Sequence, residues 1–348
     1  MYLTEQEIYD QYKALRKTYD YLLSRSDEIL DLVERLQPKS LTFIGAGSGY
    51  CLCRSGETST KIRLGLPANA LAAGDLLLNF SHYKKMLDGT LIIAPSRSGG
   101  TSEVVLAAEK AQKIGVPTLG IAAKKDAPLG AIAELTLEIP WAFDNSVCQT
   151  RTVTNLYAAN LILIAIIAKD DALLAEIDQW IDAGEDFMAK YTPLTQEVAK
   201  GEWENVVVLG DSELDGIASE AAIAFVEIPQ TPANYYHVLD VRHGPMVLVN
   251  EKTLVVMACS PTDLEHQKGL VRDIQERGAK VVTISGPVPE TWGANWEVYT
   301  ESFQNFAVMG IPFIFVPQAI AFYKALERGL NPDLPAGLSP MISLDTAK

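Results

Sequence analysis

Two hydrophobic patterns follow one another along the chain. Over residues 3–36 the apolar side chains recur at helical spacing, and this pattern stops near Pro38. We therefore expect a long helix or a helical hairpin before the first strand. The chain then changes to short apolar runs, several of which end in small polar residues, at 41–49, 90–100, 117–123 and 135–140. Runs of this kind, with helical segments between most of them, are typical of parallel strands buried on both faces.

The strand pattern occurs a second time in the same order. Four further apolar runs with intervening helical segments lie at 205–213, 253–263, 280–286 and 296–302. Residues 96–115 (SRSGGTSEVVLAAEKAQKIG) align with residues 260–278 (SPTDLEHQKGLVRDIQERG) as strand end, turn, helix and terminal glycine. The repetition predicts an α/β fold of two similar doubly wound halves, each built on a parallel sheet, after an N-terminal helical segment.

The predicted organisation has five parts. They are an N-terminal helical segment (1–37), a first α/β half (38–170), a helical connector (171–200), a second α/β half (201–330) and a C-terminal tail (331–348). The closing helix of the second half is expected at 316–328, and the sequence NPDLPAGLSP after it is typical of irregular chain.

The charge of the chain excludes some partners. Its 348 residues carry 44 acidic and 29 basic side chains, a formal net charge of -15, which is the wrong sign for a nucleic acid or an anionic membrane surface. The longest apolar stretch, 156–168, is shorter than the roughly 20 residues that span a bilayer, so it predicts a buried core helix. The N-terminal sequence is charged throughout and lacks the apolar region of a secretory signal, which favours a cytoplasmic protein.

Several common sites are missing from the sequence. The cysteines form no CxxC pair and have no histidine at ligand spacing, so we expect reduced thiols and neither a metal nor a cofactor. The glycines of GAGSG (45–49) have the spacing G-x-G-x-G instead of the G-x-G-x-x-G of dinucleotide-binding proteins. A Walker A sequence, a G-x-S-x-G elbow and an H-E-x-x-H pair do not occur either.

The segment SRSGGT, Ser96–Thr101, is the first candidate for chemistry. It lies at the carboxyl end of a predicted parallel strand, where open α/β sheets bind their ligands. Ser96, Ser98 and Thr101 supply hydroxyl groups, the two glycines let amide groups approach closely, and the following helix presents its positive end. An anionic phosphate suits such a loop without a lysine. A Ser/Gly turn that only caps the helix is the alternative.

The second candidate is the segment 219–245. Glu220 and Glu227 are seven residues apart on a predicted helix, so they project from one face that is otherwise apolar. A carboxylate beside small apolar side chains tends to have a raised pKa and can serve as a general base near neutral pH. His243 follows Glu227 by sixteen residues, before a Gly-Pro turn. Two solvated glutamates at a helix edge and a structural histidine are the alternatives.

Together these features resemble the double-SIS (sugar isomerase) family. The resemblance rests on GAGSG (45–49), SRSGGTSE (96–103), the E-x6-E helix and the RHGP sequence, and it covers about residues 35–340. This family includes the isomerase half of glutamine:fructose-6-phosphate amidotransferase, ketose/aldose phosphate isomerases, amino-sugar-phosphate deaminases and deglycases. The resemblance implies flavodoxin-like halves and a homodimer with a shared active site, in which His243 of one subunit reaches the crevice of the other.

The resemblance also assigns roles to individual residues. Glu227 would be the base that moves a proton, His243 would open the sugar ring, and Glu220 would help to order the site. The residues that would bind substrate are Ser96, Ser98 and Thr101 at the phosphate, with Ser48, Val147 and Gln149 elsewhere on the ligand.

Two lysines of the family isomerase are replaced here. Ala224 stands where that isomerase has a lysine on the E-x6-E helix, and Pro340 lies near the expected place of the second. The chain also lacks the N-terminal cysteine and the length of a glutaminase domain, so we expect no glutaminase activity.

The resulting hypothesis is an enzyme that acts on a sugar phosphate or amino-sugar phosphate, as an aldose–ketose isomerase, a deaminase or a deglycase, by proton transfer between C1 and C2. The alternative is a non-catalytic sugar-phosphate sensor. Sensors of this family usually carry a basic DNA-binding segment, which an acidic chain does not offer.

Overall fold

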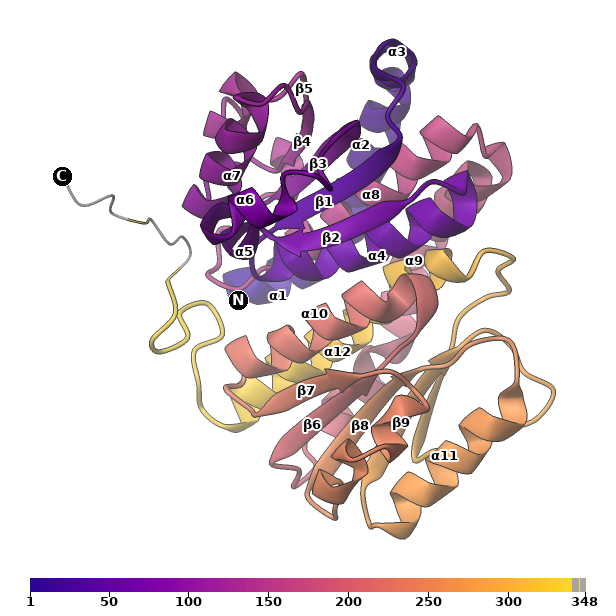
Figure 1. The fold of residues 1–348 in the computed structure, drawn as a ribbon. Coiled ribbons are helices and arrows are strands. Elements are labelled where there is room, and N and C mark those ends of the chain that lie inside the picture. The colour runs from indigo at the N-terminus through magenta and orange to yellow at the C-terminus, as the bar shows by residue number, and fades with distance from the viewer. Residues whose placement is uncertain (340–343, 345–348) are drawn as a thin grey trace. The chain divides into compact units, whose positions relative to one another are not determined.

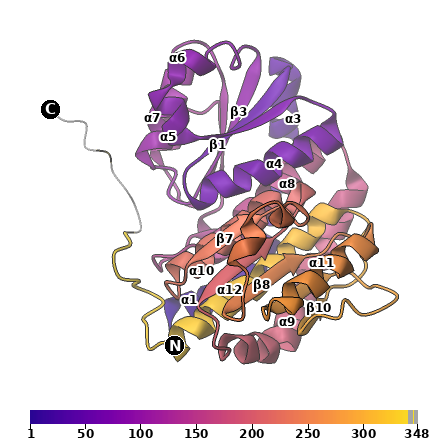
Figure 2. The ribbon, with the colours of Figure 1, turned by 60° about the horizontal axis from the view of Figure 1, so that its bottom comes forward.

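The computed structural model describes residues 1–339 and residue 344. The chain divides into two compact units, shown in two views in Figure 1 and Figure 2. The N-terminal unit comprises Asp10–Ile181 together with the described residues 339 and 344, and the C-terminal unit comprises Met1–Tyr9 and Asp182–Leu338. Helix α9 (Asp171–Ala199), which covers the predicted connector, is one continuous helix that contributes residues to both units.

The N-terminal unit is built on a five-stranded parallel sheet in the order β2-β1-β3-β4-β5. Its strands are β1 (Ser40–Gly45), β2 (Ala68–Ala72), β3 (Thr90–Ser96), β4 (Thr118–Ala122) and β5 (Leu135–Glu138). Its helices are α2 (Gln11–Ser24), α3 (Ser26–Leu36), α4 (Ser48–Leu64), α5 (Ala73–Leu78), α6 (Phe80–Tyr83), α7 (Ser102–Gln112) and α8 (Arg151–Ala168).

Both faces of this sheet are covered by helices, as its apolar strands require (Figure 1). Successive residues of a strand point to opposite faces, and Phe43 and Ile44 of β1 illustrate this. Phe43 contacts α4, where a Cβ atom at Gly56 would lie 2.6 Å from its ring. Ile44 packs with α5 and α7 through Leu76 and Ala107. Helix α8 packs against α4 and α2.

The C-terminal unit repeats the same topology. Its parallel sheet has the order β10-β9-β8-β6-β7, so β6 and β8 occupy the places of β1 and β3. Its strands are β6 (Asn205–Leu209), β7 (Ala233–Tyr236), β8 (Thr253–Ala258), β9 (Lys280–Ser285) and β10 (Trp296–Tyr299). Its other helices are α1 (Leu3–Tyr9), α10 (Asp215–Glu227), α11 (Leu264–Glu276) and α12 (Gly310–Glu327).

Helix α1 belongs to the C-terminal unit although it lies at the other end of the sequence. The amides of Leu3 and Thr4 donate hydrogen bonds to the Asp333 carboxylate at 2.9 and 2.8 Å, and the Thr4 hydroxyl donates to the same group. Helix α1 also packs against α12, and its Ile8 side chain is fully buried. The first nine residues therefore complete the core of the C-terminal unit.

The predicted fold class is confirmed: both halves are doubly wound α/β units with parallel sheets. Eight strands lie in the predicted segments, whereas β2 and β7 are strands that the hydrophobic pattern did not indicate. The closing helix α12 begins at Gly310, six residues before the predicted start. Pro312 permits this start, since it falls in the first turn, where an amide hydrogen is not required. Pro317 is accommodated inside it.

Among the residues that the structure describes, two apolar segments are long enough to cross a membrane by length and composition, α8 and residues 306–327. In both, most of the apolar window is buried in the protein, 83% and 89% respectively. Burial of this extent is typical of the core helices of globular proteins, as predicted for residues 156–168.

Candidate functional site

The loop between β3 and α7 folds around its own hydroxyl groups. The Ser96 hydroxyl oxygen accepts a hydrogen bond from the Gly99 amide (3.0 Å), and the Ser98 oxygen accepts one from the Gly100 amide (3.1 Å). The Thr101 hydroxyl lies 3.4 Å from that of Ser98. Thr101 is the N-cap residue of α7, yet its side chain makes no capping hydrogen bond. Its hydroxyl is therefore not used to cap the helix.

Glycine is required at position 99 for two independent reasons. Its backbone has a φ of +56°, which strains residues that carry a side chain. A Cβ atom at this position would also lie 2.6 Å from the Ala127 Cβ and 3.0 Å from the Ala122 Cβ. The loop thus turns sharply against strand β4, which keeps its hydroxyl and amide groups at the carboxyl edge of the sheet.

A small pocket of about 50 Å³ opens at this loop. Four of the predicted substrate-binding residues line it, namely Ser96, Ser98, Thr101 and Gln149. Ala46 and Gly49, from the loop after β1, line it as well, so the pocket lies between the carboxyl ends of β1 and β3. In the strand order 2-1-3-4-5 this is the point where the chain reverses its direction across the sheet, which is where such folds bind ligands. The volume suits one small group such as a phosphate.

The other two predicted binding residues lie close to this pocket without lining it. Ser48 is the first residue of α4 and is 5% exposed, next to Gly49. Val147 lies in the loop that holds Gln149, and its carbonyl oxygen accepts a hydrogen bond from Arg97.

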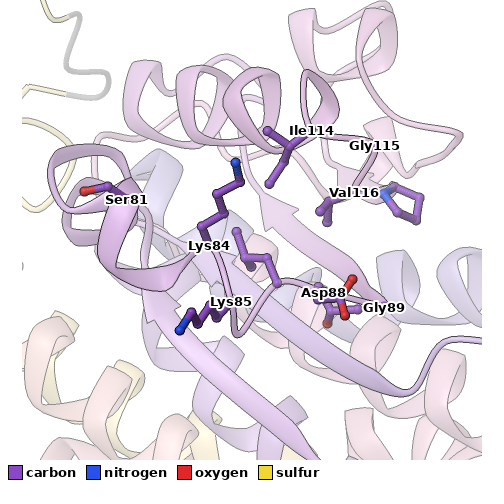
Figure 3. Close-up of a pocket in the computed structure, with 11 residues that line it drawn as sticks. Ser81, Lys84, Lys85, Asp88, Gly89, Ile114, Gly115 and Val116 are labelled. Carbon is purple, nitrogen blue, oxygen red and sulfur yellow. The ribbon is translucent and has the colours of Figure 1, made fainter.

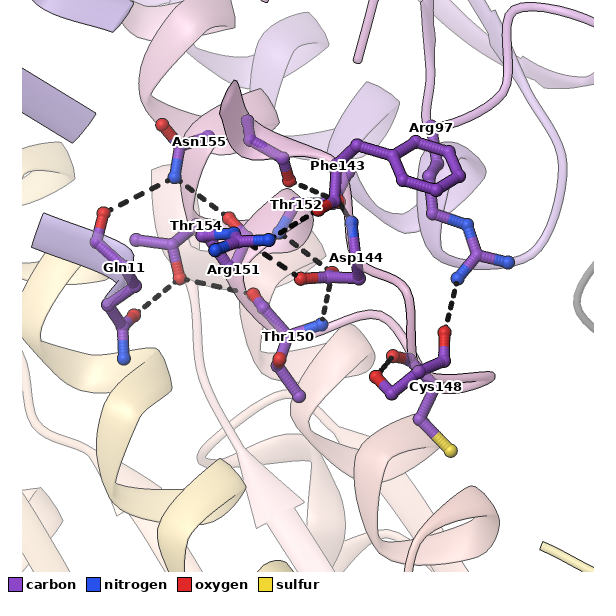
Figure 4. Close-up of polar contacts among 12 residues, drawn as sticks. Gln11, Arg97, Phe143, Asp144, Cys148, Thr150, Arg151, Thr152, Thr154 and Asn155 are labelled. Carbon is purple, nitrogen blue, oxygen red and sulfur yellow. Dashed lines mark hydrogen bonds and ion pairs between the residues drawn. The ribbon is translucent and has the colours of Figure 1, made fainter. Parts of the chain in front are cut away.

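Arg97 is a residue of the site that the sequence analysis missed. It lies between the two serines, lines the pocket, and is only 9% exposed. Its Nη1 atom donates to the carbonyl oxygens of Ser146 (3.2 Å) and Val147 (2.9 Å), and its guanidinium lies over the Phe143 ring at 5.9 Å from the ring centre (Figure 4). Its position between two serines that are predicted to bind ligand was the available signal, but its hydrogen-bond partners are about 50 residues away in the sequence.

Asp144 anchors the other end of the same loop. Its buried carboxylate accepts hydrogen bonds from the amides of Thr150 (2.8 Å) and Thr152 (2.9 Å), at the start of α8 (Figure 4). The Thr152 hydroxyl in turn accepts from the Asp144 amide and donates to the Ala142 carbonyl. A carboxylate at the start of α8 also interacts favourably with the positive end of its helix dipole. The loop 143–150 is thereby fixed to the helix that follows it.

The two glutamates lie on one helix of the C-terminal unit, as predicted. Glu220 is 2% exposed in the middle of α10, and Glu227 is the last residue of this helix and half-buried. Ala224, between them, is buried and carries no amine. Pro340, the other position where a family lysine is expected, lies outside the described residues.

His243 ends a short 3-10 helix of the C-terminal unit and is exposed to solvent. Its amide donates to the Asp240 carbonyl at 2.8 Å, which fixes the backbone. Gly244 follows with a φ of +124° and leads into Pro245. The RHGP sequence therefore forms a tight corner that presents the imidazole at the surface.

The cysteines offer no nucleophile. All four thiols are free and buried, and burial raises the pKa of Cys53 and Cys259 well above the usual range. A thiol with a raised pKa is mostly protonated and unreactive. Within residues 1–339 and 344, the structure contains no cluster of three or more histidine, cysteine, aspartate or glutamate side chains that could hold a metal ion.

A larger pocket, of about 690 Å³, lies at the opposite edge of the N-terminal sheet (Figure 3). Thr90, the first residue of β3, and Pro117, just before β4, belong to its lining. The lysines that line it, Lys84 and Lys85, are exposed. Open α/β sheets bind ligands at the carboxyl ends of their strands, so the smaller pocket is the better candidate for the functional site.

Comparison with known proteins shows what this chain is similar to. Residues 36–166 match the family model described as SIS domain. A glutamine–fructose-6-phosphate aminotransferase (isomerizing) of Sulfurisphaera tokodaii is 22% identical over 97% of this chain, which spans 56% of that relative's length. The D-galactosamine-6-phosphate deaminase AgaS of Shewanella sp. is 25% identical over 95% of the chain and 87% of its own length.

One solved structure shows how far the likeness in fold extends. Tagatose-6-phosphate ketose/aldose isomerase from Escherichia coli superposes with a TM-score of 0.86 at 21% identity, and the match covers 97% of each chain. The two-halved architecture is thus shared over almost the whole length of both proteins.

Proposed function

We propose, from the match of residues 36–166 to the SIS domain model, that the chain is an enzyme that acts on a sugar phosphate or amino-sugar phosphate. The observation that carries the proposal is the pocket at the carboxyl ends of β1 and β3, lined by the hydroxyl groups of Ser96, Ser98 and Thr101. Hydroxyls, closely spaced amides and the positive end of α7 favour a phosphate group.

The proposed reaction moves one proton between C1 and C2 of the open-chain sugar. Glu227 takes a proton from the carbon next to the carbonyl group, the C–H electron pair forms the double bond of an enediol, or of an enolamine for an amino sugar, and the carbonyl oxygen takes up a proton from solvent. Return of the proton from Glu227 to the former carbonyl carbon, with loss to solvent of the proton on the neighbouring hydroxyl or amine, completes the transfer. His243 assists ring opening, Glu220 orders the site, and Ser48, Val147 and Gln149 contact the ligand beyond its phosphate.

Three reaction outcomes share this proton transfer: aldose–ketose isomerisation, deamination and deglycation. In the last two the transfer gives an imine, and water from the solvent then hydrolyses it to the carbonyl product with release of ammonia or an amino acid. Relatives named as an isomerase and as a deaminase support the first two. Ala224 supplies no amine, which disfavours the amination of a sugar from glutamine, and we propose that the chain has no glutaminase activity. We place the protein in the cytoplasm, where its buried free thiols stay reduced.

A product screen tests the enzyme proposal. Hexose 6-phosphates, hexosamine 6-phosphates and fructosamine 6-phosphates are incubated with the protein, and ammonia, released amino acid and ketose/aldose conversion are followed separately. We expect turnover of one of these classes, with thermal protection by the sugar phosphate that clearly exceeds protection by the free sugar. Protection without any turnover favours the sensor. Equal protection by the unphosphorylated sugar refutes phosphate binding by Ser96–Thr101, the phosphate loop.

We further propose a homodimer in which His243 of one subunit reaches the active site of the other. The residues that follow this histidine support an interface, since Val247 and Leu248 are 78% and 58% exposed and no catalytic role requires their exposure. Sedimentation should give about twice 38.0 kDa. A fully active monomer would contradict the shared site.

A further inference from the structure

We propose that Arg97 is a positioning residue, which holds the loop 143–150 against the phosphate loop so that Gln149 stands in the wall of the pocket. This inference rests on the proposed function and deepens it. Arg97 thereby contributes to the discrimination between a sugar phosphate and inorganic phosphate. The phosphate group itself is bound by the hydroxyls and amides of the phosphate loop.

The contacts of Arg97 point to the neighbouring loop. Its Nη1 atom donates to two consecutive carbonyl oxygens, those of Ser146 and Val147, at 3.2 and 2.9 Å. The guanidinium carbon also lies over the Phe143 ring of the same loop, 5.9 Å from the ring centre. A guanidinium that donates to two carbonyl oxygens and lies within cation–π range of an aromatic ring contacts the loop at two places, whereas an ammonium group lacks this planar fork of donors.

The loop 143–150 is consequently fixed at two places. Asp144 ties one part of it to the amides of Thr150 and Thr152 at the start of α8, through bonds that do not involve Arg97. Arg97 ties residues 146 and 147 to the phosphate loop. Gln149, which lines the pocket, lies between these two anchors. Loss of Arg97 should therefore release the middle of the loop and leave its attachment to α8 in place.

The binding test compares two probes on the same variants. We expect wild-type protein to bind fructose 6-phosphate at least tenfold more tightly than inorganic phosphate in calorimetric titrations. Arg97→Gln should keep its affinity for inorganic phosphate within about threefold, and lose about tenfold in affinity for fructose 6-phosphate, because the hydrogen bond of Gln149 to the sugar is lost and such a bond contributes on this scale. Arg35→Gln removes an exposed arginine of the same unit, paired with Glu134, and should change neither affinity. An equal loss for both probes would make Arg97 a phosphate ligand and overturn the inference.

A second measurement follows the loop without any ligand. Amide hydrogen exchange of peptides covering 145–149 should rise about tenfold or more in Arg97→Gln, while exchange within α8 stays unchanged. Arg97→Lys, which keeps the positive charge, should restore part of the protection. If exchange at 145–149 equals that of the wild type, Arg97 does not hold the loop. Because exchange is read in the free protein, it decides the role of Arg97 even if fructose 6-phosphate does not bind and the proposed function fails.

A double-mutant cycle separates action through Gln149 from a direct effect. If Arg97 acts by placing Gln149, Arg97→Gln should cost little further fructose 6-phosphate affinity in a Gln149→Ala background. Fully additive losses would show that the two side chains act independently, and would overturn the positioning role.

Discussion

The loops that follow β3 and β8 occupy the same place in the two sheets and differ in what satisfies their polar groups. In the N-terminal unit, the Ser96 and Ser98 hydroxyls accept bonds from the loop's own amides, and a pocket opens beside them. In the C-terminal unit, the Gln267 side chain from α11 enters the corresponding loop. It accepts from the Ser260 amide (2.9 Å) and donates to the carbonyls of Ser260 (3.1 Å) and Thr262 (2.6 Å).

The charges at the two places differ as well. The N-cap residue of α7 is Thr101, which is neutral, whereas the N-cap of α11 is Asp263, whose carboxylate lies 2.7 Å from His266. A second carboxylate, Asp211, follows β6 and accepts from the Val238 amide. A phosphate would meet two negative groups at this edge. The two halves share one topology, but the inserted Gln267 side chain and the two carboxylates make the C-terminal loop less suited to an anion than the N-terminal loop.

The largest expected effect separates the binding proposed for the N-terminal unit from the acid–base chemistry proposed for the C-terminal unit. Glu227→Gln keeps the shape of the side chain and removes the base, so kcat should fall on the order of 10²-fold or more with little change in the affinity for sugar phosphate. Exchange of solvent deuterium into the sugar at C1 or C2 should disappear with it. Exchange at the wild-type rate would assign the base to another residue.

A smaller effect compares the two loops directly. Ser98→Ala with Thr101→Ala should weaken sugar-phosphate binding by about 10- to 100-fold, since two hydroxyls that contact a charged group are lost. The matched pair, Ser260→Ala with Thr262→Ala, should leave binding unchanged. Isothermal titration of both double variants measures the contrast. A comparable loss from the second pair would show that the C-terminal loop also takes part in binding.

Smaller effects are expected from the backbone of the loops. Gly99→Ala should lower the free energy of unfolding by about 1–3 kcal/mol, because the added Cβ meets Ala127 and Ala122 in addition to the strain of a positive φ. Gly115→Ala is the control: it has a φ of +80° but no atom within 4 Å of the new Cβ, so it should cost less. Urea denaturation of both variants gives the difference. Equal losses would mean that contact with β4 contributes nothing.

A matched change in the C-terminal loop should act in the opposite direction. Asp263 carries a positive φ of 52° without being glycine, so Asp263→Gly should remove strain and raise stability by up to about 1 kcal/mol, reduced by the loss of its pair with His266. The same urea measurement tests this expectation. A clear destabilisation would show that the carboxylate contributes more to the loop than the backbone strain costs.

The sequence was sufficient for those parts of the fold that depend on local pattern. Central strands are buried on both faces and appear as apolar runs, whereas β2 and β7 are edge strands, partly exposed, with the sequences ANALA and ANYY. Such strands need no apolar run and were missed for this reason. The start of α12 was predicted too late because of Pro312 and Pro317, since proline within an apolar segment usually indicates the end of a helix.

The candidate site was predictable to a similar extent. Ser96, Ser98 and Thr101 follow a strand and precede a helix, so local sequence was enough to place them at the edge of the sheet. Arg97 could not be interpreted in the same way, since its function depends on carbonyl groups at 146 and 147 that only the tertiary fold brings near. The roles proposed for Glu227 and His243 remain predictions that the variants above test.

Helix α1 has a consequence for how the protein is made. The ribosome synthesises it about 300 residues before α12 and Asp333, which at about 5–20 residues per second is a delay of about 15–60 s. During this time the N-terminal unit can fold. Ile8 and Thr4 are already synthesised, but the residues of the C-terminal unit that they contact are not. The C-terminal unit is therefore expected to resist protease only after residue 333 has emerged, and a fusion at the N-terminus should disturb this distant unit before the adjacent one.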